Sequence, residues 1–363
     1  MKKTLIALLV LALLAAGCAA PTAAPAPAPA APAAEEPTPV PAAEEPTALP
    51  AAEEPAAPPA AAPAACVIHV GPINDNGWTQ AHHEGLVAAT EAVGWELKEI
   101  ESIFNPSDVE RITREYAQSP DCAVVVGTAQ NFDPDMRTVA AEFPDKPFLI
   151  LHGEKPDSNI GTYFGRMYEP RYLSGLVAGK MTDTKIIGFV AAYENNPQVA
   201  RGRDAFIKGV AEVCPDCEVK VVYTNNWVSP PDETEAASAL ISAGADILAQ
   251  HQDTDAVQQR AAQAGILGIG YDSDMQQSVG ESVLTSPIWD WSKYYLPQFE
   301  AIKSGTWAPE WYWGSEIVSL APFSPRVPDD VRALVAEYQQ KILNGEITIF
   351  DMPDEELWGY GTQ

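Results

Sequence analysis

Basic side chains are scarce in this sequence of 363 residues. It has 22 Lys and Arg against 50 Asp and Glu, and its formal net charge is −28. So acidic a surface repels the phosphates of nucleic acids and of anionic lipids, which argues against both as partners. It suits a neutral or cationic ligand instead. His and Cys are also few, five of each, and the His are too scattered to predict a metal site.

The apolar run at the start of the chain, residues 5–16, is too short to span a bilayer comfortably. Lys2 and Lys3 precede this run, and small residues lead from it into Cys18. This order is typical of a removable bacterial lipoprotein signal. We expect residues 1–18 to be that signal and Cys18 to carry lipid, which would anchor the chain at the cell membrane on its extracytoplasmic face. An ordinary signal peptide and an uncleaved anchor are the alternatives.

Aromatic residues are absent from residues 19–65, which are almost all Ala, Pro, Glu and Thr. The unit Ala-Ala-Glu-Glu-Pro recurs at 33–37, 42–46 and 51–55. Such a segment cannot bury enough apolar surface to offset the entropy cost of ordering it. We therefore expect a disordered linker that acts as a spacer.

With Cys18 assigned to lipid, four cysteines are left, an even number that suits an oxidising compartment. Cys66 and Cys122 begin the first and third predicted strands, which are neighbours in a doubly wound sheet. Parallel neighbours lie about 4.8 Å apart, a separation that a disulfide can span. We predict a Cys66–Cys122 disulfide. Cys214 and Cys217 lie between a helix and a strand, which favours a local disulfide over a redox motif.

Short β-branched runs alternate with amphipathic stretches through the rest of the chain, which predicts an α/β fold with parallel sheets covered by helices. Strands are expected at 67–71, 96–101, 122–127, 147–152, 160–164, 185–190, 218–224, 246–250, 267–271 and 314–320. Helices are expected at 80–93, 106–118, 197–213, 231–243, 254–264 and 328–343. Two successive Rossmann-like series predict two lobes joined by several crossovers. We assign 66–166 and 283–305 to an N-terminal lobe, 167–282 and 306–350 to a C-terminal lobe, and 351–363 to a tail.

Polar and aromatic side chains follow the predicted strands, where ligands bind in sheets of this kind. The candidate ligand-binding residues are Asn74, Asp75, Trp78, Asn131, Phe132, Trp227, Asp253, Asp272, Asp274 and Trp289. Trp78 and Trp227 follow strands of opposite lobes, so they can sandwich a flat heteroaromatic ring between them. Asp and Asn groups would then hydrogen-bond to the edge of the ring. His251 is either a further ligand contact or a satisfied strand-end residue.

Three stretches, 71–80, 168–181 and 270–275, resemble the basic membrane protein (BMP) family, and the likeness extends over 66–345. The family consists of substrate-binding lipoproteins of ABC importers. The resemblance implies a type I periplasmic-binding fold, with two Rossmann-like lobes, a multi-strand hinge and a ligand cleft between the lobes. It also implies permease subunits as partners, no catalysis, no cofactor, and purine nucleosides or related rings as ligands.

Position by position, the resemblance implies that Trp78 and Trp227 stack on the ring. Asp75 matches an early carboxylate of the family, and Asp272 or Asp274 matches the acid that contacts ribose. Trp289 stands where the family often has a lysine near the sugar. Because an indole fills sugar space and cannot replace an ammonium, this departure favours a free base such as adenine.

Two other functions are weighed against transport. The protein is expected to be a monomer in any case. The long linker would also suit a surface receptor that senses a small heteroaromatic ligand. Asp272 and Asp274 invite a nucleoside hydrolase, because glycosidic bonds are cleaved by paired carboxylates. Alternate residues of an extended segment point opposite ways, however, which disfavours a shared substrate. The sequence contains no P-loop motif, so no ATP site is expected.

Overall fold

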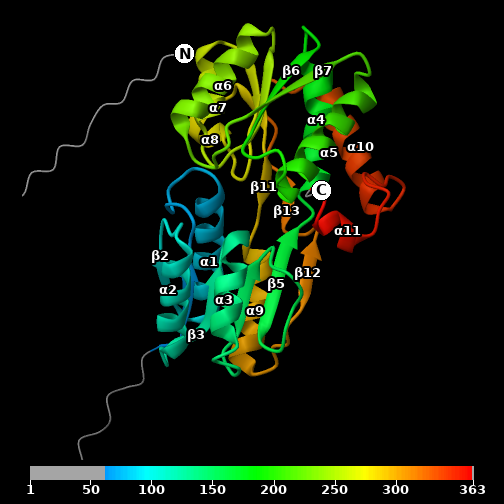
Figure 1. Ribbon diagram of the computed structural model, residues 1–363. Coiled ribbons are helices and arrows are strands. Elements are labelled where there is room, and N and C mark those ends of the chain that lie inside the picture. The colour runs from blue at the N-terminus through cyan, green and yellow to red at the C-terminus, as the bar shows by residue number, and fades with distance from the viewer. Residues whose placement is uncertain (1–61, 362–363) are drawn as a thin grey trace, which may run out of the picture. The chain divides into compact units, whose positions relative to one another are not determined.

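The computed structural model describes residues 62–361. The predicted signal, Cys18, nearly all of the predicted linker and residues 362–363 lie outside the described residues. Within residues 62–361, no helix has both the length and the apolar character that a membrane span requires. The described chain forms two parallel sheets, each covered by helices on both faces (Figure 1).

The N-terminal lobe contains six parallel strands in the order β12-β5-β4-β3-β1-β2. These are β1 (Ala64–Ile68), β2 (Glu96–Ile100), β3 (Cys122–Gly127), β4 (Phe148–Leu151), β5 (Ile160–Gly165) and β12 (Trp311–Gly314). Helices α1 (Trp78–Val93) and α9 (Ser292–Ser304) pack together on one face. Helices α2 (Pro106–Gln118) and α3 (Asp133–Ala140), with the short η1 (Gln130–Phe132), cover the other. Val124 and Val125 of β3 point to opposite faces and belong to these two separate cores.

The C-terminal lobe contains five parallel strands in the order β10-β9-β8-β6-β7. These are β6 (Ile186–Ala191), β7 (Glu218–Tyr223), β8 (Ile247–His251), β9 (Leu267–Ile269) and β10 (Val283–Thr285). One face carries α4 (Tyr168–Met181), α5 (Pro197–Val213) and α10 (Asp329–Leu343). The other carries α6 (Pro230–Ser242) and α7 (Ala256–Gln263), and α8 (Gln276–Val279) precedes β10.

The chain passes between the lobes at three places: between β5 and α4, between β10 and α9, and between β12 and α10. The second and third passages pair as a two-stranded antiparallel sheet, β11 (Pro287–Trp289) with β13 (Val318–Leu320). Further backbone hydrogen bonds join Asp290 to Ile317 and Ala321 to Ser286. The first passage and these two paired passages together form the hinge.

The boundaries of the two lobes differ from the predicted ones in the return segment. Strand β10, expected in the N-terminal lobe, pairs with β9 in the C-terminal sheet. Strand β12, expected in the C-terminal lobe, lies beside β5, with Trp311 opposite Thr162. The predicted strand 314–320 is two strands, because the chain leaves the first sheet at Gly314 and pairs with β11 from Val318. The expected tail contains helix α11 (Asp354–Trp358).

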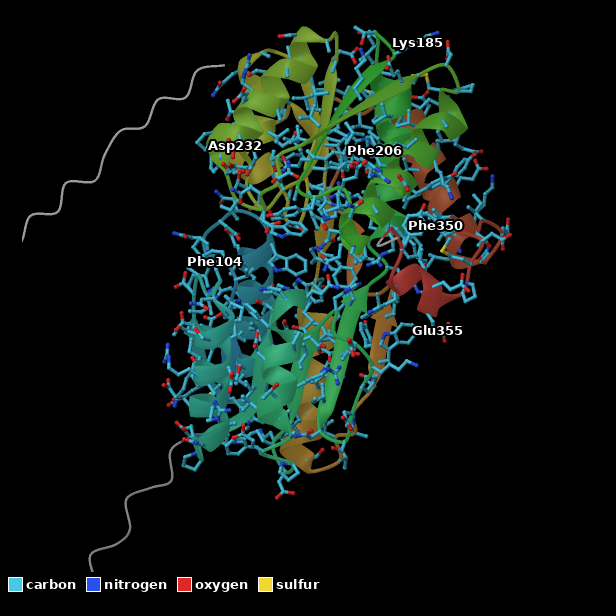
Figure 2. The ribbon with its side chains drawn as sticks, in the orientation of Figure 1. Phe104, Lys185, Phe206, Asp232, Phe350 and Glu355 are labelled. Atoms are coloured by element: carbon cyan, nitrogen blue, oxygen red, sulfur yellow. A yellow bond between two sulfur atoms is a disulfide. The ribbon has the colours of Figure 1, made fainter. Side chains whose placement is uncertain are left out.

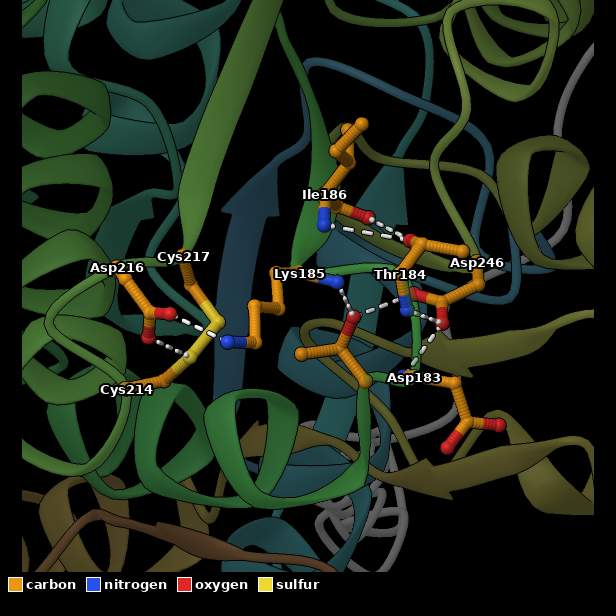
Figure 3. Close-up of a disulfide and its surroundings, with 9 residues drawn as sticks. Asp183, Thr184, Lys185, Ile186, Cys214, Asp216, Cys217 and Asp246 are labelled. Carbon is orange, nitrogen blue, oxygen red and sulfur yellow. Dashed lines mark hydrogen bonds and ion pairs between the residues drawn. A yellow bond between two sulfur atoms is a disulfide. The ribbon is translucent and has the colours of Figure 1, made fainter.

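Both predicted disulfides are present in the structure. Cys66 of β1 is joined to Cys122 of β3, with the two Cα atoms 5.7 Å apart, and these two strands are neighbours in the sheet. Cys214 and Cys217 form a local bridge between α5 and β7. Asp216 lies in the short loop that this bridge closes and forms an ion pair with Lys185, just before the neighbouring strand β6 (Figure 3). The second bridge therefore fixes a surface turn far from the strand ends that face the other lobe.

Candidate functional site

A cavity of about 560 Å³ lies between the lobes, where the carboxyl ends of both sheets face each other. The N-terminal lobe contributes Val70, Gly71, Trp78, Phe104, Ala129, Gln130, Asn131 and Leu151 to its wall. The C-terminal lobe contributes Tyr193, Asn196, Gln198, Asn226, Trp227, Val228, His251, Asp253 and Tyr271. The volume lies in the range of about 300–1,000 Å³ that is usual for small-molecule sites.

Trp78 begins helix α1 and forms part of the buried wall of the cavity, with 6% of its surface exposed. Its indole N–H donates a hydrogen bond to the carbonyl of Thr128 at 3.0 Å. The ring packs edge-on against Trp289 and Trp291, at 5.6 and 5.7 Å between centroids. This support fixes the indole plane, so Trp78 offers a rigid aromatic surface to a ligand.

Trp227 lies on the opposite lobe, in the loop between β7 and α6, and is half-buried. Its ring contacts Tyr193 at 5.5 Å and His251 at 6.1 Å between centroids. Its backbone carbonyl accepts a hydrogen bond from the amide of Asp253. The structure thus brings one tryptophan from each lobe to the same cavity.

Asp253 follows strand β8 and is buried in the cavity wall, with 6% of its surface exposed. Its carboxylate accepts no hydrogen bond from any residue in 62–361. Burial raises the pKa of this carboxyl well above its usual range, and the negative charges of Asp272, Asp75 and Glu233 raise it further. Asp253 therefore supplies a hydrogen-bonding group that the protein itself leaves free.

His251 and Tyr271 lie beside Asp253 in the same wall. Their ring centroids are 4.3 Å apart, and the guanidinium of Arg171 lies 3.6 Å above the Tyr271 ring. Burial, together with Arg171 and Arg201, holds the pKa of His251 well below its usual range. The imidazole is therefore neutral at pH 7, and neither ring nitrogen has a hydrogen-bond partner among residues 62–361. Its Nδ1 is fully buried beside Gly202 of α5, which leaves Nε2 as the ring nitrogen available to a ligand. It can accept or donate one hydrogen bond in the cavity.

Of the ten predicted ligand-binding residues, four line the cavity: Trp78, Asn131, Trp227 and Asp253. The other six do not belong to its wall. Asn74 is exposed on the loop before α1. Phe132 is fully buried in the core beneath α3.

Two of the predicted acids act at the starts of helices. Asp75 accepts hydrogen bonds from the backbone amides of Gly77, Thr79 and Gln80, at 2.8, 2.9 and 3.1 Å. Asp274 accepts from the amide of Gln276 at the start of α8. An acid that follows a strand and precedes a helix can either bind a ligand or cap the helix, since helix starts leave backbone N–H groups free.

Asp272 and Trp289 bind each other behind the cavity. The Trp289 indole N–H donates to the Asp272 carboxylate at 2.9 Å, and neither side chain belongs to the cavity wall. Trp289 also stacks on Trp291 at 4.5 Å. Asp272 is completely buried, and burial raises its pKa well above its usual range. Asp272 is therefore separated from a ligand in the cavity, and its carboxyl group binds the Trp289 indole instead.

Several cavity residues were absent from the predicted set. Among them are Phe104, Tyr193, Gln198 and Tyr271, with His251 left open. Phe104 and Tyr193 lie four and two residues beyond the ends of β2 and β6, so the strand-end rule applied to every strand would have found them. Gln198 lies at the start of α5 and has no comparable signal in the sequence.

The two lobes are in contact beside the cavity. Ser273 of the C-terminal lobe donates a hydrogen bond to the carbonyl of Asn76 at 2.6 Å. Gly77 lies so close to Asp253 that a Cβ added to it would be 2.3 Å from the Asp253 carbonyl oxygen. The structure therefore has its lobes closed over the cavity. Within residues 62–361, no group of three His, Cys, Asp or Glu is arranged to hold a metal ion.

Two relatives that match most of the chain are more than 30% identical to it. A protein of Haloferax volcanii, named as a proposed glucose-binding protein of an ABC transporter, is 37% identical over 289 residues, which are 79% of this chain and 73% of the relative. A purine-binding protein of Brucella abortus is 34% identical over 291 residues, 79% of this chain and 82% of the relative.

Solved structures share the fold. An ABC transporter solute-binding protein from Aeropyrum pernix superposes with a TM-score of 0.70 at 18% identity, covering 83% of this chain and 98% of that protein. One from Conexibacter woesei gives 0.68 at 22%, covering 81% and 99%. The two lobes and their hinge are thus a type I periplasmic-binding fold. Residues 62–351 match the family of PnrA-like ABC transporter substrate-binding proteins, and the chain belongs to this Bmp family.

Proposed function

We propose that this substrate-binding protein captures a purine base, such as adenine, and delivers it to the permease subunits of an ABC importer. Capture needs no chemical step: the lobes close over the ligand, and the ligand favours closure by the difference between its affinities for the closed and open forms.

We further propose that Cys18 is acylated and anchors the protein. Mass spectrometry of the membrane fraction would detect the lipid on Cys18, and a free Cys18 would exclude it.

The observation that carries this proposal is a tryptophan from each lobe on one cavity. Closure brings Trp78 and Trp227 to the same ligand, and each base stacked on an aromatic side chain contributes about 1–3 kcal/mol. Asp253 and His251 are buried in the same cavity with hydrogen-bonding atoms that the protein leaves free. A purine edge carries both N–H donors and ring nitrogen acceptors, so it can satisfy both groups.

The burial of Asp272 and its hydrogen bond to Trp289 favour a free base over a nucleoside as the ligand. In nucleoside binders of this family, the matching acid is expected to contact ribose. Here Asp272 is completely buried and bound to the indole of Trp289. Its Oδ1 accepts from this indole, and its Oδ2 has no partner but is also buried outside the cavity wall. A sugar in the cavity would therefore not reach this acid.

A sugar is the second candidate ligand. The name of the Haloferax relative points to glucose, and amide side chains that can bind sugar hydroxyls line part of the cavity: Gln130, Asn131, Asn196, Gln198 and Asn226. The purine-binding relative and the paired tryptophans support the base instead.

Isothermal titration calorimetry of the purified protein with adenine, hypoxanthine, adenosine, guanosine and D-glucose tests the proposal. We expect adenine to bind, adenosine to bind more weakly, and glucose not to bind. Trp227→Ala should weaken adenine binding by about 5- to 150-fold, the equivalent of about 1–3 kcal/mol. Trp307→Ala is the control, because this half-buried tryptophan donates to Gln298 and lies outside the cavity wall. Glucose binding without adenine binding would overturn the proposal.

A further inference from the structure

Large hydrophobic side chains are exposed at the mouth of the cavity, beside the exposed amides of Asn131 and Asn226. Within residues 62–361, four large hydrophobic side chains are exposed, and three of them line this cavity: Phe104 at 64%, Tyr193 at 37% and Val228 at 36%. The fourth, Leu343, lies on α10, outside the cavity wall. Single exposed hydrophobic residues are ordinary, whereas their concentration around one opening indicates a binding surface.

Both lobes contribute to this apolar mouth. Phe104 follows β2 and lies at the end of the N-terminal lobe that faces the other lobe (Figure 2). Tyr193 and Val228 follow β6 and β7 of the C-terminal lobe. Tyr193 also contacts Trp227 at 5.5 Å between ring centroids, so the mouth is continuous with the proposed stacking surface. These side chains remain exposed although the lobes are in contact, so closure by itself does not cover them.

The deep part of the cavity differs from the mouth. Its wall contains the hydrogen-bonding groups of Asp253, His251 and Tyr271, all buried to 6% exposure or less. A ligand that satisfies these groups with a polar ring edge would lie at the deep end. The cavity of about 560 Å³ has the size of sites for drug-sized molecules, which are larger than a bare purine. The remaining space lies toward the apolar mouth.

We infer that the physiological ligand is a heteroaromatic base with an apolar substituent, whose ring lies between the tryptophans and whose substituent packs against Phe104, Tyr193 and Val228. The inference rests on the proposed function and narrows its ligand class. Burying the substituent would remove apolar surface of both ligand and protein from water, which favours binding in proportion to the area buried. A ribose in the same place would gain little from these three side chains, and its hydroxyls would depend on the exposed amides of Asn131 and Asn226.

Calorimetry of the purified protein with adenine, N6-benzyladenine, N9-benzyladenine and adenosine tests this inference. We expect at least one benzyl derivative to bind about tenfold or more tightly than adenine, since a buried phenyl ring removes a large apolar area from water. Phe104→Ala should remove most of that preference, measured as the ratio of the dissociation constant of adenine to that of the tighter-binding benzyl derivative. Leu343→Ala should leave the ratio unchanged, because Leu343 is also 64% exposed but lies outside the cavity wall.

The outcomes separate the inference from the proposed function. If adenine binds and both benzyl derivatives bind equally or more weakly, the apolar substituent is excluded while purine capture stands. Tighter binding of adenosine than of every benzyl derivative would likewise exclude it. If none of the four purines binds, the proposed function fails and the inference fails with it. A preference that survives Phe104→Ala would show that the substituent does not lie at the mouth.

Discussion

Asp253 combines two properties that rarely occur together in a carboxyl group. It is buried in the cavity wall, and no group within 62–361 donates a hydrogen bond to its side chain. The neighbouring acids Asp272, Asp75 and Glu233 add repulsion and raise its pKa further. Such a group destabilises the closed protein when it is ionised, and a ligand N–H would relieve that cost. Asp253 therefore couples ligand capture to pH.

The pH dependence has a definite sign. Below the ordinary carboxyl pKa of about 4, Asp253 is protonated in both the folded and the unfolded protein, and the folded form has its full stability. As pH rises toward the raised pKa, the unfolded chain loses its proton first, so folded stability falls. Each unit of raised pKa corresponds to about 1.4 kcal/mol. The Asp253→Asn variant lacks this titration.

We therefore expect Asp253→Asn to raise the melting temperature at pH 7–8 and to leave it nearly unchanged near pH 4. Differential scanning calorimetry across this range measures the effect. The exposed Asp145 serves for comparison, and Asp145→Asn should change the melting temperature little at any pH. A shift of equal size at both ends of the range would mean that the substitution at Asp253 acts through packing and not through charge.

The loop between β1 and α1 acts as a closure element. Asp75 fixes it through three backbone N–H groups, and Gly77 then meets the backbone of Asp253 on the other lobe. A side chain at residue 77 has no space in the closed form, because its Cβ would lie 2.3 Å from a carbonyl oxygen. In an open form this contact is absent, so the glycine is required for closure.

Gly77→Ala should hold the lobes apart and weaken adenine binding by about 10- to 100-fold, since the closed form becomes a minor population. Calorimetry measures the affinity, and small-angle X-ray scattering measures the radius of gyration of the free protein, which should increase. Gly161→Ala is a suitable control, because its Cβ would have ordinary contacts of 3.4 Å with Leu149 and 3.5 Å with Trp307. Unchanged scattering and unchanged affinity in Gly77→Ala would show that closure does not depend on this contact.

The features that could be predicted from the sequence are those that depend on the order of strands and loops along the chain. Cys66 and Cys122 could be paired because the first and third strands of a doubly wound sheet are neighbours, and Trp78 and Trp227 could be placed because strand ends face the cleft. The edge strands β10 and β12 could not be assigned to their lobes, because the chain forms them as it passes back and forth between the two sheets. An acid such as Asp75 has the same local sequence signal whether it binds a ligand or begins a helix.

At the scale of the whole molecule, the C-terminal segment joins both lobes. Trp358 of α11 stacks on His152 of the N-terminal lobe at 4.3 Å, and its indole N–H donates to the Gly153 carbonyl. Arg201 of the C-terminal lobe donates to the carbonyls of Leu357 and Trp358 at 2.7 and 2.5 Å. Figure 1 shows α11 at the junction of the two lobes. This segment adds a further connection to the three hinge passages.

Removing the Trp358 ring should therefore lower the stability of the protein and let the angle between the lobes vary over a wider range. We expect Trp358→Ala to reduce the free energy of unfolding by about 3 kcal/mol and to broaden the distribution of distances in scattering from the free protein. Urea denaturation measures the first effect. Tyr360→Phe is the control, because it removes a single hydrogen bond to Asp204 and should cost about 1 kcal/mol or less. If the two variants lose the same stability and scatter alike, α11 only covers the surface, and the three hinge passages alone set the angle between the lobes.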